Sequence, residues 1–266
     1  MTILGVCRPN LLDSFVASAD ANQNAVNIFK GEWASALPSS LGVRAGAIPL
    51  FEDERIQWLN QRFPVAGKTV LELGPLEGGH TWQLERLGAA SILSLEANTR
   101  AFLKCLIVKE LLDMKRVRFR CVDFMAYLES VPGPVDLCVA SGVLYHMRQP
   151  VALLERACRV ADSLFLWTHY YDESFIRRNR NIAFRFSSGV PAEFGGFHHT
   201  MYRREYGTGL FSRRSFGGNA GFSHWLHRDD ILGALRHFGL TEIETQFEQT
   251  DHPHGPCFAL IAKRRK

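Results

Sequence analysis

The chain has 266 residues, 46% hydrophobic and 22% charged, which is enough for one large core and fits one decorated domain better than two. It has no apolar run of about 18 residues, and residues 1–17 lack a basic start followed by an apolar stretch, so we expect neither a membrane span nor a secretory signal. The six cysteines are scattered without a Cys-x-x-Cys pair, which favours a cytoplasmic protein without disulfides and argues against a cysteine zinc site.

The net charge of +4 is unevenly distributed along the chain. Residues 174–224 carry eight arginines against two glutamates, a balance of +6, whereas the rest of the chain has 23 basic and 25 acidic side chains, a balance of −2. The segment 174–224 is therefore basic, and the positive and negative charges of the rest of the chain nearly balance.

The first 65 residues are expected to form a helical extension that packs on the rest of the chain. Residues 20–36 place Val26, Phe29 and Trp33 at helical spacing, and a second helix begins near Asp53. The stretch 24–33 could close over a bound ligand, but packing explains its apolar stripe equally well.

From residue 68 the pattern changes to alternating strands and helices. We expect strands at 69–73, 91–95, 117–122, 135–140 and 163–167, with helices at 79–87, 99–114 and 150–161. After 174–224 a helix at 229–238 and strands at 242–247 and 257–262 are expected. This order predicts an α/β fold, a doubly wound, mostly parallel sheet of seven strands, with 66–173 and 225–266 as the core and 174–224 as an insert.

A glycine turn comes after the first expected strand, in the sequence Val70-Leu-Glu-Leu-Gly-Pro-Leu-Glu-Gly-Gly79. Gly74 allows a tight turn and close approach of a ligand, and Gly78 and Gly79 would leave the next helix N-terminus uncovered for an anionic group. Glu96 closes the second strand, where a carboxylate can accept both hydroxyls of a ribose. Asp123 closes the third, where a carboxylate can accept an adenine amine. The carboxyl edge of a parallel sheet is where such folds bind ligands.

These elements resemble the class I S-adenosylmethionine-dependent methyltransferases, from about residue 68 to the C-terminus, and imply a Rossmann-like sheet and S-adenosylmethionine as cofactor. The family's acidic residue and three glycines correspond here to Glu72, Gly74, Leu76 and Gly78, so the middle glycine is replaced. A dinucleotide dehydrogenase would also place an acid on a ribose, but its Gly-x-Gly-x-x-Gly pattern is missing. The resemblance implies a cofactor site formed by Glu72, Gly74, Pro75, Gly78, Gly79, Glu96, Asp123, Phe124 and Ser141.

The fourth expected strand leads into Ser141-Gly-Val-Leu-Tyr-His146, which is similar to a segment of the tRNA wobble-uridine carboxymethyltransferases. In the class I fold this loop lies beside the sulfonium, so Tyr145 and His146 would line the methyl-transfer channel. An imidazole there can take a proton from the attacking group. The alternative is that His146 only packs the loop.

His169, at the end of the fifth strand, is a second candidate base. With Asp172 or Glu173 it could hold a divalent metal, but a hydrogen-bonded histidine and solvated carboxylates are favoured, and the other histidines show no zinc spacing. The sequence therefore predicts no metal. We interpret Cys257, which comes directly after a proline in the last strand, as a core residue.

The insert 174–224 combines ten aromatic residues, eight glycines and eight arginines. This composition could bind a phosphate, a carboxylated sugar or stacked RNA bases, and we expect Arg203, Arg204 and the nearby Tyr170 to contact the acceptor. The alternative is an ordered lid whose arginines pair with the acidic body of the protein.

Together these features predict methyl transfer from S-adenosylmethionine to an oxygen or nitrogen of a small molecule, preferably a sugar or secondary-metabolite hydroxyl. The acceptor could be acidic, and the oligomeric state is open. One alternative is an RNA (tRNA) methyltransferase, suggested by the Tyr145-His146 segment and the basic insert. The other is a catalytically silent cofactor-binding partner subunit.

Overall fold

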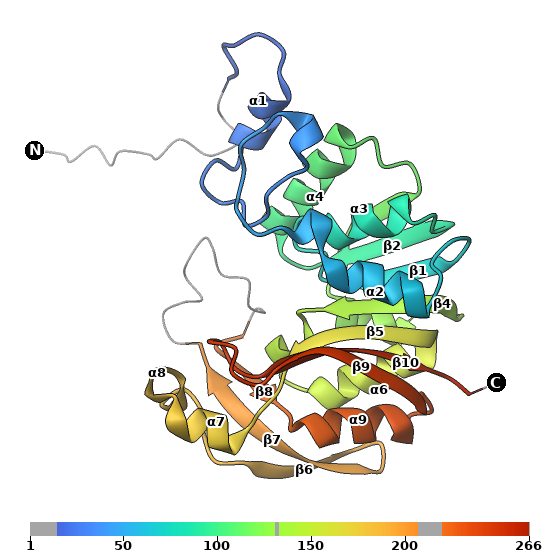
Figure 1. The fold of residues 1–266 in the computed structure, drawn as a ribbon, viewed down its shortest axis with the longest axis vertical. Coiled ribbons are helices and arrows are strands. Elements are labelled where there is room, and N and C mark those ends of the chain that lie inside the picture. The colour runs from blue at the N-terminus through green and yellow to red at the C-terminus, as the bar shows by residue number, and fades with distance from the viewer. Residues whose placement is uncertain (1–14, 131–132, 207–219, 266) are drawn as a thin grey trace, which may run out of the picture.

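The computed structural model describes residues 15–130, 133–206 and 220–265. A seven-stranded sheet with the order β3-β2-β1-β4-β5-β10-β9 runs through the middle of the protein (Figure 1). The strands are β1 (Thr69–Leu73), β2 (Ser91–Glu96), β3 (Val117–Cys121), β4 (Val135–Ser141), β5 (Ala161–His169), β9 (Glu242–Gln249) and β10 (Cys257–Lys263). Strands β1 to β5 pair in parallel, and β10 is antiparallel to both of its neighbours. The expected seven-stranded, mostly parallel sheet is confirmed.

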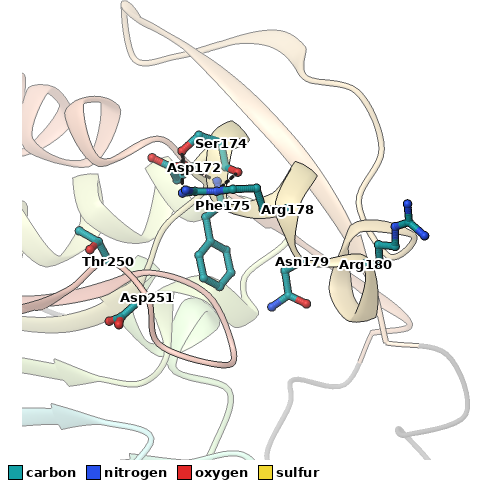
Figure 2. A pocket seen from close by; sticks show the side chains of 8 residues that line it. All are labelled: Asp172, Ser174, Phe175, Arg178, Asn179, Arg180, Thr250 and Asp251. Atoms are coloured by element: carbon teal, nitrogen blue, oxygen red, sulfur yellow. Dashed lines mark hydrogen bonds between the residues drawn. The ribbon is translucent and has the colours of Figure 1, made fainter.

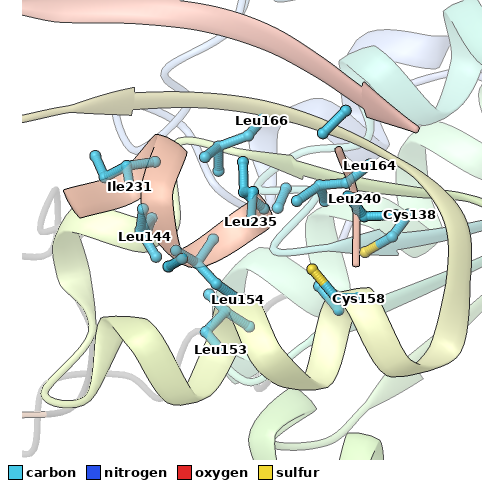
Figure 3. Packing of buried hydrophobic residues seen from close by; sticks show 14 of the residues in the cluster. Cys138, Leu144, Leu153, Leu154, Cys158, Leu164, Leu166, Ile231, Leu235 and Leu240 are labelled. Carbon is cyan, nitrogen blue, oxygen red and sulfur yellow. The ribbon is translucent and has the colours of Figure 1, made fainter. Parts of the chain in front are cut away.

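Helices cover both faces of this sheet, because the strands present apolar side chains on both sides. One face carries α5 (Phe124–Ser130), α6 (Pro150–Val160) and α9 (Arg228–His237). The other face carries α2 (Glu54–Arg62), α3 (Gly79–Arg86) and α4 (Thr99–Leu111). Figure 3 shows leucines of α6 meeting Ile231 and Leu235 of α9 beneath the sheet. Within the described residues no helix is long and apolar enough to cross a membrane.

Several helices begin or end at residue types that are favoured at helix ends. The Asp53 side chain accepts the Arg55 N–H at 3.0 Å at the start of α2, and the Asn98 side chain accepts two backbone N–H groups at the start of α4. Pro150 occupies the first turn of α6, and Gly239 takes a positive φ of 97° after α9.

The helix expected over 20–36 is wrong in its extent. Helix α1 (Asn22–Asn27) is short, because the chain turns at Gly31 (φ +79°) and the N–H groups of Ala34 and Ser35 donate to the carboxylate of Glu77 rather than to helix carbonyls. The apolar stripe is nevertheless buried beside α4 (Figure 1), in a cluster that includes Val26, Phe29, Trp33, Cys105 and Val108. The extension therefore packs on the core, as expected.

The described part of the insert is folded. It contains α7 (Glu173–Arg178), α8 (Arg180–Ala183) and a three-stranded antiparallel sheet of β6 (Val190–Phe194), β7 (Phe197–Glu205) and β8 (Phe222–Trp225). The expected contributions of Arg213 and Arg214 to its charge lie outside the described residues. Strand β8 runs beside the turn after β4, where the His224 N–H donates to the Met147 carbonyl at 2.8 Å.

Candidate active site

The glycine turn after β1 touches the turn after β4. Gly74 has a φ of +64°, and its N–H donates to the Leu95 carbonyl of β2 at 2.9 Å. A Cβ at this position would lie 2.6 Å from Cγ1 of Val143, so a side chain cannot be accommodated without movement. The two turns therefore approach each other at the carboxyl edge of the sheet, and the expected approach of a ligand to Gly74 stays a prediction.

Leu76 stands where the resembling family has its middle glycine, and it adopts the conformation that a glycine would adopt. Its φ is +57°, which is uncommon for a residue with a side chain. Its N–H donates to Oε2 of Glu96 at 3.2 Å. The replacement thus keeps a left-handed loop and ties it to the end of β2.

The expectation that Gly78 and Gly79 leave the N-terminus of α3 uncovered is wrong. Both residues are buried, and a Cβ on Gly79 would lie 2.7 Å from the carbonyl oxygen of Leu50. Gly78 has a φ of +80° and faces the Phe119 ring. Gly79 thus admits the segment that precedes α2 and Gly78 admits the Phe119 ring, while the preceding Pro75 is buried within the loop.

Glu72 is an internal support of the turn. Its carboxylate accepts hydrogen bonds from the hydroxyls of Thr81 and Ser94, the latter at 2.8 Å, and it is only 2% exposed. Burial raises the pKa of Glu72, and the two hydroxyls offset this only in part. It therefore links β1 to β2 and α3, and its carboxylate is engaged inside the protein.

Glu96 ends β2, as expected, and Asp123 lies two residues beyond the end of β3, directly before α5. The Glu96 carboxylate accepts the N–H groups of Asn98 at 2.8 Å and Leu76, which occupy two of about four lone-pair positions of a carboxylate and leave room for ribose hydroxyls. Burial raises the pKa of Glu96 in spite of these bonds. Asp123 is exposed and accepts the Met125 N–H at 2.8 Å.

Two further expected cofactor residues lie close in the fold to this edge. Phe124 begins α5 and packs partly against the core, and Ser141 ends β4 directly opposite Trp167 in the strand register. These placements are compatible with the proposed contacts, which stay predictions.

Glu77 is a residue of this turn whose role the sequence did not reveal. It is fully buried, and it accepts the Lys104 ammonium at 2.7 Å and the backbone N–H groups of Ala34 and Ser35 at 3.0 and 2.7 Å. Lys104 is 5% exposed and also donates to the Glu32 carbonyl at 2.6 Å. A buried ion pair thus joins the glycine turn, α4 and the N-terminal extension.

Tyr145, His146, Arg204, Tyr206 and Trp225 gather beside the turn after β4, and we refer to them as the His146 cluster. The Tyr145 and His146 rings lie 4.1 Å apart, and the Trp225 indole N–H donates to the Tyr145 carbonyl at 3.1 Å. Tyr206 contributes a hydroxyl 2.7 Å from Nδ1 of His146. Tyr206 and Trp225 were not singled out from the sequence, and their only signal was the aromatic richness of the insert.

The His146 imidazole is held in its neutral form. Burial lowers the pKa of His146 to about 3, assisted by the nearby Arg204 and His169. Because the Tyr206 hydroxyl donates to Oγ of Ser223 at 3.0 Å, Nδ1–H of His146 is the matching donor to Tyr206, and Nε2 keeps the lone pair. This pKa lies well below the value of about 6.5 that a histidine side chain ordinarily has.

His169 is buried between the His146 cluster and the start of β10. Its ring stacks on Trp225 at 5.4 Å and meets Tyr145 at 4.8 Å, while Nδ1 donates to the Gly255 carbonyl at 2.7 Å. Burial lowers its pKa to about 4. Asp172 does not join it, because that carboxylate accepts the Ser174 hydroxyl and the N–H of Phe175. Glu173 likewise pairs with Arg177.

The two expected acceptor arginines behave differently, because adjacent residues of a strand point to opposite faces. Arg204 lies over Trp225 at 4.8 Å and over Tyr206, and its Nε is buried without a hydrogen-bond partner among the described residues. Arg203 instead pairs with Glu205 at 2.7 Å. The expectation that both arginines face one acceptor is therefore not supported by the geometry.

Tyr170, the third expected acceptor residue, lies in the core and not in the His146 cluster. It is 5% exposed, its ring meets Phe258 at 5.6 Å, and its hydroxyl donates to Glu248 at 3.1 Å. As the neighbour of His169 on β5, it points to the opposite face of the sheet. Tyr170 therefore packs in the core, and the geometry does not support the expected contact with the acceptor.

A cavity of about 780 Å³ lies between α7 and the turn after β9. Figure 2 shows Asp172, Ser174 and Arg178 joined by hydrogen bonds along one wall, with Thr250 and Asp251 on the other. None of its lining residues belongs to the glycine turn or to the His146 cluster. This cavity is therefore distinct from the candidate active site.

No protein-family model and no curated protein matches the chain, but solved structures do. The N-terminal domain of EvdMO1, crystallised in the presence of S-adenosylhomocysteine and D-fucose, has a TM-score of 0.69 and 24% identity, and the match covers 92% of this chain and 95% of that one. Magnesium protoporphyrin IX methyltransferase from Synechocystis, with S-adenosylhomocysteine bound, has a TM-score of 0.53 and 16% identity over 80% and 81% of the two chains. The N-methyltransferase NodS from Bradyrhizobium japonicum, in complex with the same compound, has a TM-score of 0.52 and 16% identity over 81% and 88%.

These likenesses, together with the strand order and the position of the glycine turn, establish the architecture expected from the sequence. The chain therefore has the fold of the class I S-adenosylmethionine-dependent methyltransferases.

Proposed function

We propose that this protein is an enzyme that binds S-adenosylmethionine at the edge formed by Gly74, Glu96 and Asp123 and transfers its methyl group to a hydroxyl of a small sugar. The observation that carries the proposal is the neutral, hydrogen-bonded imidazole of His146 beside the turn that meets Gly74. A sugar hydroxyl is a weak nucleophile, and a base that removes its proton during attack suits it.

The residues of the edge fit such a cofactor. Gly74 has no side chain where one would collide with Val143, and Glu96 keeps acceptor positions for two hydroxyls. S-adenosylmethionine supplies a methyl group already activated on a sulfonium. The protein's contribution is then to position the acceptor in line with that group and to manage one proton.

The proton passes to Nε2 of His146. The acceptor O–H bond breaks as the new O–CH₃ bond forms, and the electron pair of the S–CH₃ bond returns to sulfur, which leaves a methyl ether and S-adenosylhomocysteine. Burial and Arg204 disfavour the His146 cation, so the imidazole acts as a weak base that holds the proton only briefly. Tyr206 holds the ring in the tautomer that this step needs.

The sugar class is supported by the walls of the site. The partly exposed ring of Tyr145 offers a face on which the apolar side of a sugar can rest, and the unpartnered Nε of Arg204 offers a donor. The N-terminal domain of EvdMO1, which has the TM-score of 0.69, was crystallised in the presence of D-fucose. An acceptor that carries a carboxylate would in addition pair with Arg204.

The RNA alternative loses support from the insert itself. Arg177 pairs with Glu173 and Arg203 pairs with Glu205, so two of the eight arginines of the insert are matched by neighbouring carboxylates and are not free for an RNA backbone. We place the enzyme in the cytoplasm, as one domain with an extension and an insert. The five described cysteines are free thiols, which suits a reducing compartment.

The test is incubation with isotopically labelled S-adenosylmethionine and a panel of 6-deoxysugars, free and nucleotide-linked, with bulk tRNA as a parallel acceptor. Label should enter a sugar, and the product mass should rise by one methyl group. The His146→Ala variant should bind S-adenosylhomocysteine like the wild type yet transfer little label. Transfer to tRNA alone would refute the sugar assignment, and binding without transfer to any pool would favour a silent partner subunit.

A further inference from the structure

His169, His252 and Cys257 form a cluster that the proposed function does not use. Each offers one ligand atom, and these atoms all lie within 4.8 Å of one another. The expectation of no metal rested on spacing along the chain, but the three donors come from two segments that are distant in sequence. His169 ends β5 and Cys257 begins β10, directly opposite each other in the antiparallel register.

On the β5 side of the cluster, a hydrogen bond to the backbone fixes the orientation of the His169 ring. The Nδ1–H of His169 donates to the Gly255 carbonyl at 2.7 Å, which fixes the ring and leaves the lone pair of the neutral imidazole on Nε2. Histidines that bind metals commonly donate their other nitrogen to a backbone carbonyl in this way. His252 lies in the turn between β9 and β10, where it accepts the His254 N–H at 3.2 Å, a long bond that metal coordination would replace.

A cavity of about 220 Å³ reaches two of the three donors. His252 and Cys257 line it together with Trp167, and Asp53, Glu54 and Arg55 form part of the remaining wall. This cavity gives a metal ion a path to the cluster.

The one arginine among the described residues of the cavity wall is paired, so this wall adds no uncompensated arginine charge beside the cluster. Burial alone would raise the pKa of Asp53, but hydrogen bonds from His80 and Arg55 outweigh it and hold that pKa well below its usual range. Asp53 is therefore a permanent carboxylate on the wall of the cavity, and it neutralises Arg55, the nearest cation of the lining.

We propose that His169, His252 and Cys257 bind a Zn²⁺ ion, with a fourth coordination position open toward the 220 Å³ cavity. Two imidazoles and a thiolate are a donor set that zinc accepts, and three protein ligands with one open position are usual for zinc that contacts a small molecule. Binding releases the Cys257 proton to solvent, because only the thiolate is a ligand. The ion would draw the donors closer than 4.8 Å and pin the β9–β10 turn to the end of β5, beneath Tyr145.

Cobalt is the direct probe, since Co²⁺ occupies zinc sites and a thiolate bound to it gives an ultraviolet charge-transfer absorption. The full-length protein, treated with chelator and dialysed, is titrated with Co²⁺ in the absence of cofactor and acceptor. The expected result is one equivalent bound, with the thiolate band present, and its loss when Zn²⁺ is added. Because no activity is measured, failure of the methyl-transfer proposal would not alter this outcome.

Variants assign the ligands. Cys257→Ser should abolish the thiolate band, and His252→Ala, which removes a partly exposed side chain, should weaken binding on the order of 10²-fold. His254→Ala, an exposed neighbour two residues away, is the matched control and should bind like the wild type. Absence of the band in the wild type would overturn the proposal. Equal losses in His252→Ala and His254→Ala, or a band that survives in Cys257→Ser, would also overturn it.

Discussion

Replacement of Glu77 by alanine tests whether the buried ion pair holds the N-terminal extension on the core. The side chain is fully buried and accepts Lys104 and the N–H groups of Ala34 and Ser35. Without Glu77, the Lys104 ammonium loses the carboxylate that balances its charge. Lys104 is only 5% exposed, and the Glu32 carbonyl remains as its acceptor.

Loss of one partner of a buried pair costs about 3–5 kcal/mol, since the other charge stays buried without compensation. We therefore expect Glu77→Ala to lower the free energy of unfolding by about that amount. Glu77→Gln keeps the shape and one acceptor oxygen, so it should fold more readily and show a smaller loss. Replacement of both partners, Glu77→Leu with Lys104→Met, should recover part of the stability, because no buried charge then remains.

Urea denaturation monitored by tryptophan fluorescence measures these values, and Trp33 lies in the segment that Glu77 holds. Glu173→Ala is the matched control, because Glu173 pairs with Arg177 on an exposed helix surface, and it should cost about 1 kcal/mol or less. If Glu77→Ala lost no more unfolding free energy than Glu173→Ala, the buried ion pair would not be what holds the N-terminal extension on the core.

Four further predictions concern the candidate active site. Glu96→Ala should weaken S-adenosylhomocysteine binding by about 1.5–3 kcal/mol in calorimetry, the range for hydrogen bonds to a charged group, and unchanged affinity would remove Glu96 from the site. His146→Ala should lower kcat by about 10²–10⁴-fold. Because the pKa of His146 is about 3, its imidazole is already neutral above about pH 5, and wild-type kcat should not rise with pH through a histidine pKa between about pH 5 and 8. A rise in kcat with a midpoint near about pH 6.5 that is lost in His146→Ala would contradict this. Arg204→Met should raise the acceptor KM with cofactor affinity unchanged, whereas Arg203→Met should leave both near wild type in steady-state kinetics. Leu76→Gly should bind S-adenosylhomocysteine like the wild type and unfold within about 1 kcal/mol of it, because glycine accepts the positive φ, and a tenfold loss of affinity would show that the Leu76 side chain shapes the loop.

The order of the core elements was predictable, because strand and helix patterns are local. Apolar runs such as 69–73 and 135–140 became strands β1 and β4 within a residue of the expected bounds. Gly74, Glu96 and Asp123 could be placed at one edge for the same reason: each lies at the end of a parallel strand or within two residues after it, and all such ends meet on one side of a sheet.

The contacts between distant segments could not be predicted in this way. Residues 28–36 have helical spacing, but Glu77 competes for their backbone N–H groups, and only the folded chain brings that carboxylate to them. Among the eight arginines of the insert the sequence favoured Arg203 and Arg204 alike, and the pairing of β7 with β8 selected Arg204 for the His146 cluster.

Burial decided the chemistry of the histidines. The sequence placed His146 and His169 at the carboxyl edge, but their lowered pKa values arise mainly from burial in the folded chain, with Arg204 of the insert contributing to both. The sequence by itself determined which strands form the edge, because hydrophobic periodicity is a property of neighbouring residues. Only the tertiary structure decided which side chains are desolvated there and which partners they meet, because desolvation and hydrogen bonding depend on segments that are far apart along the chain.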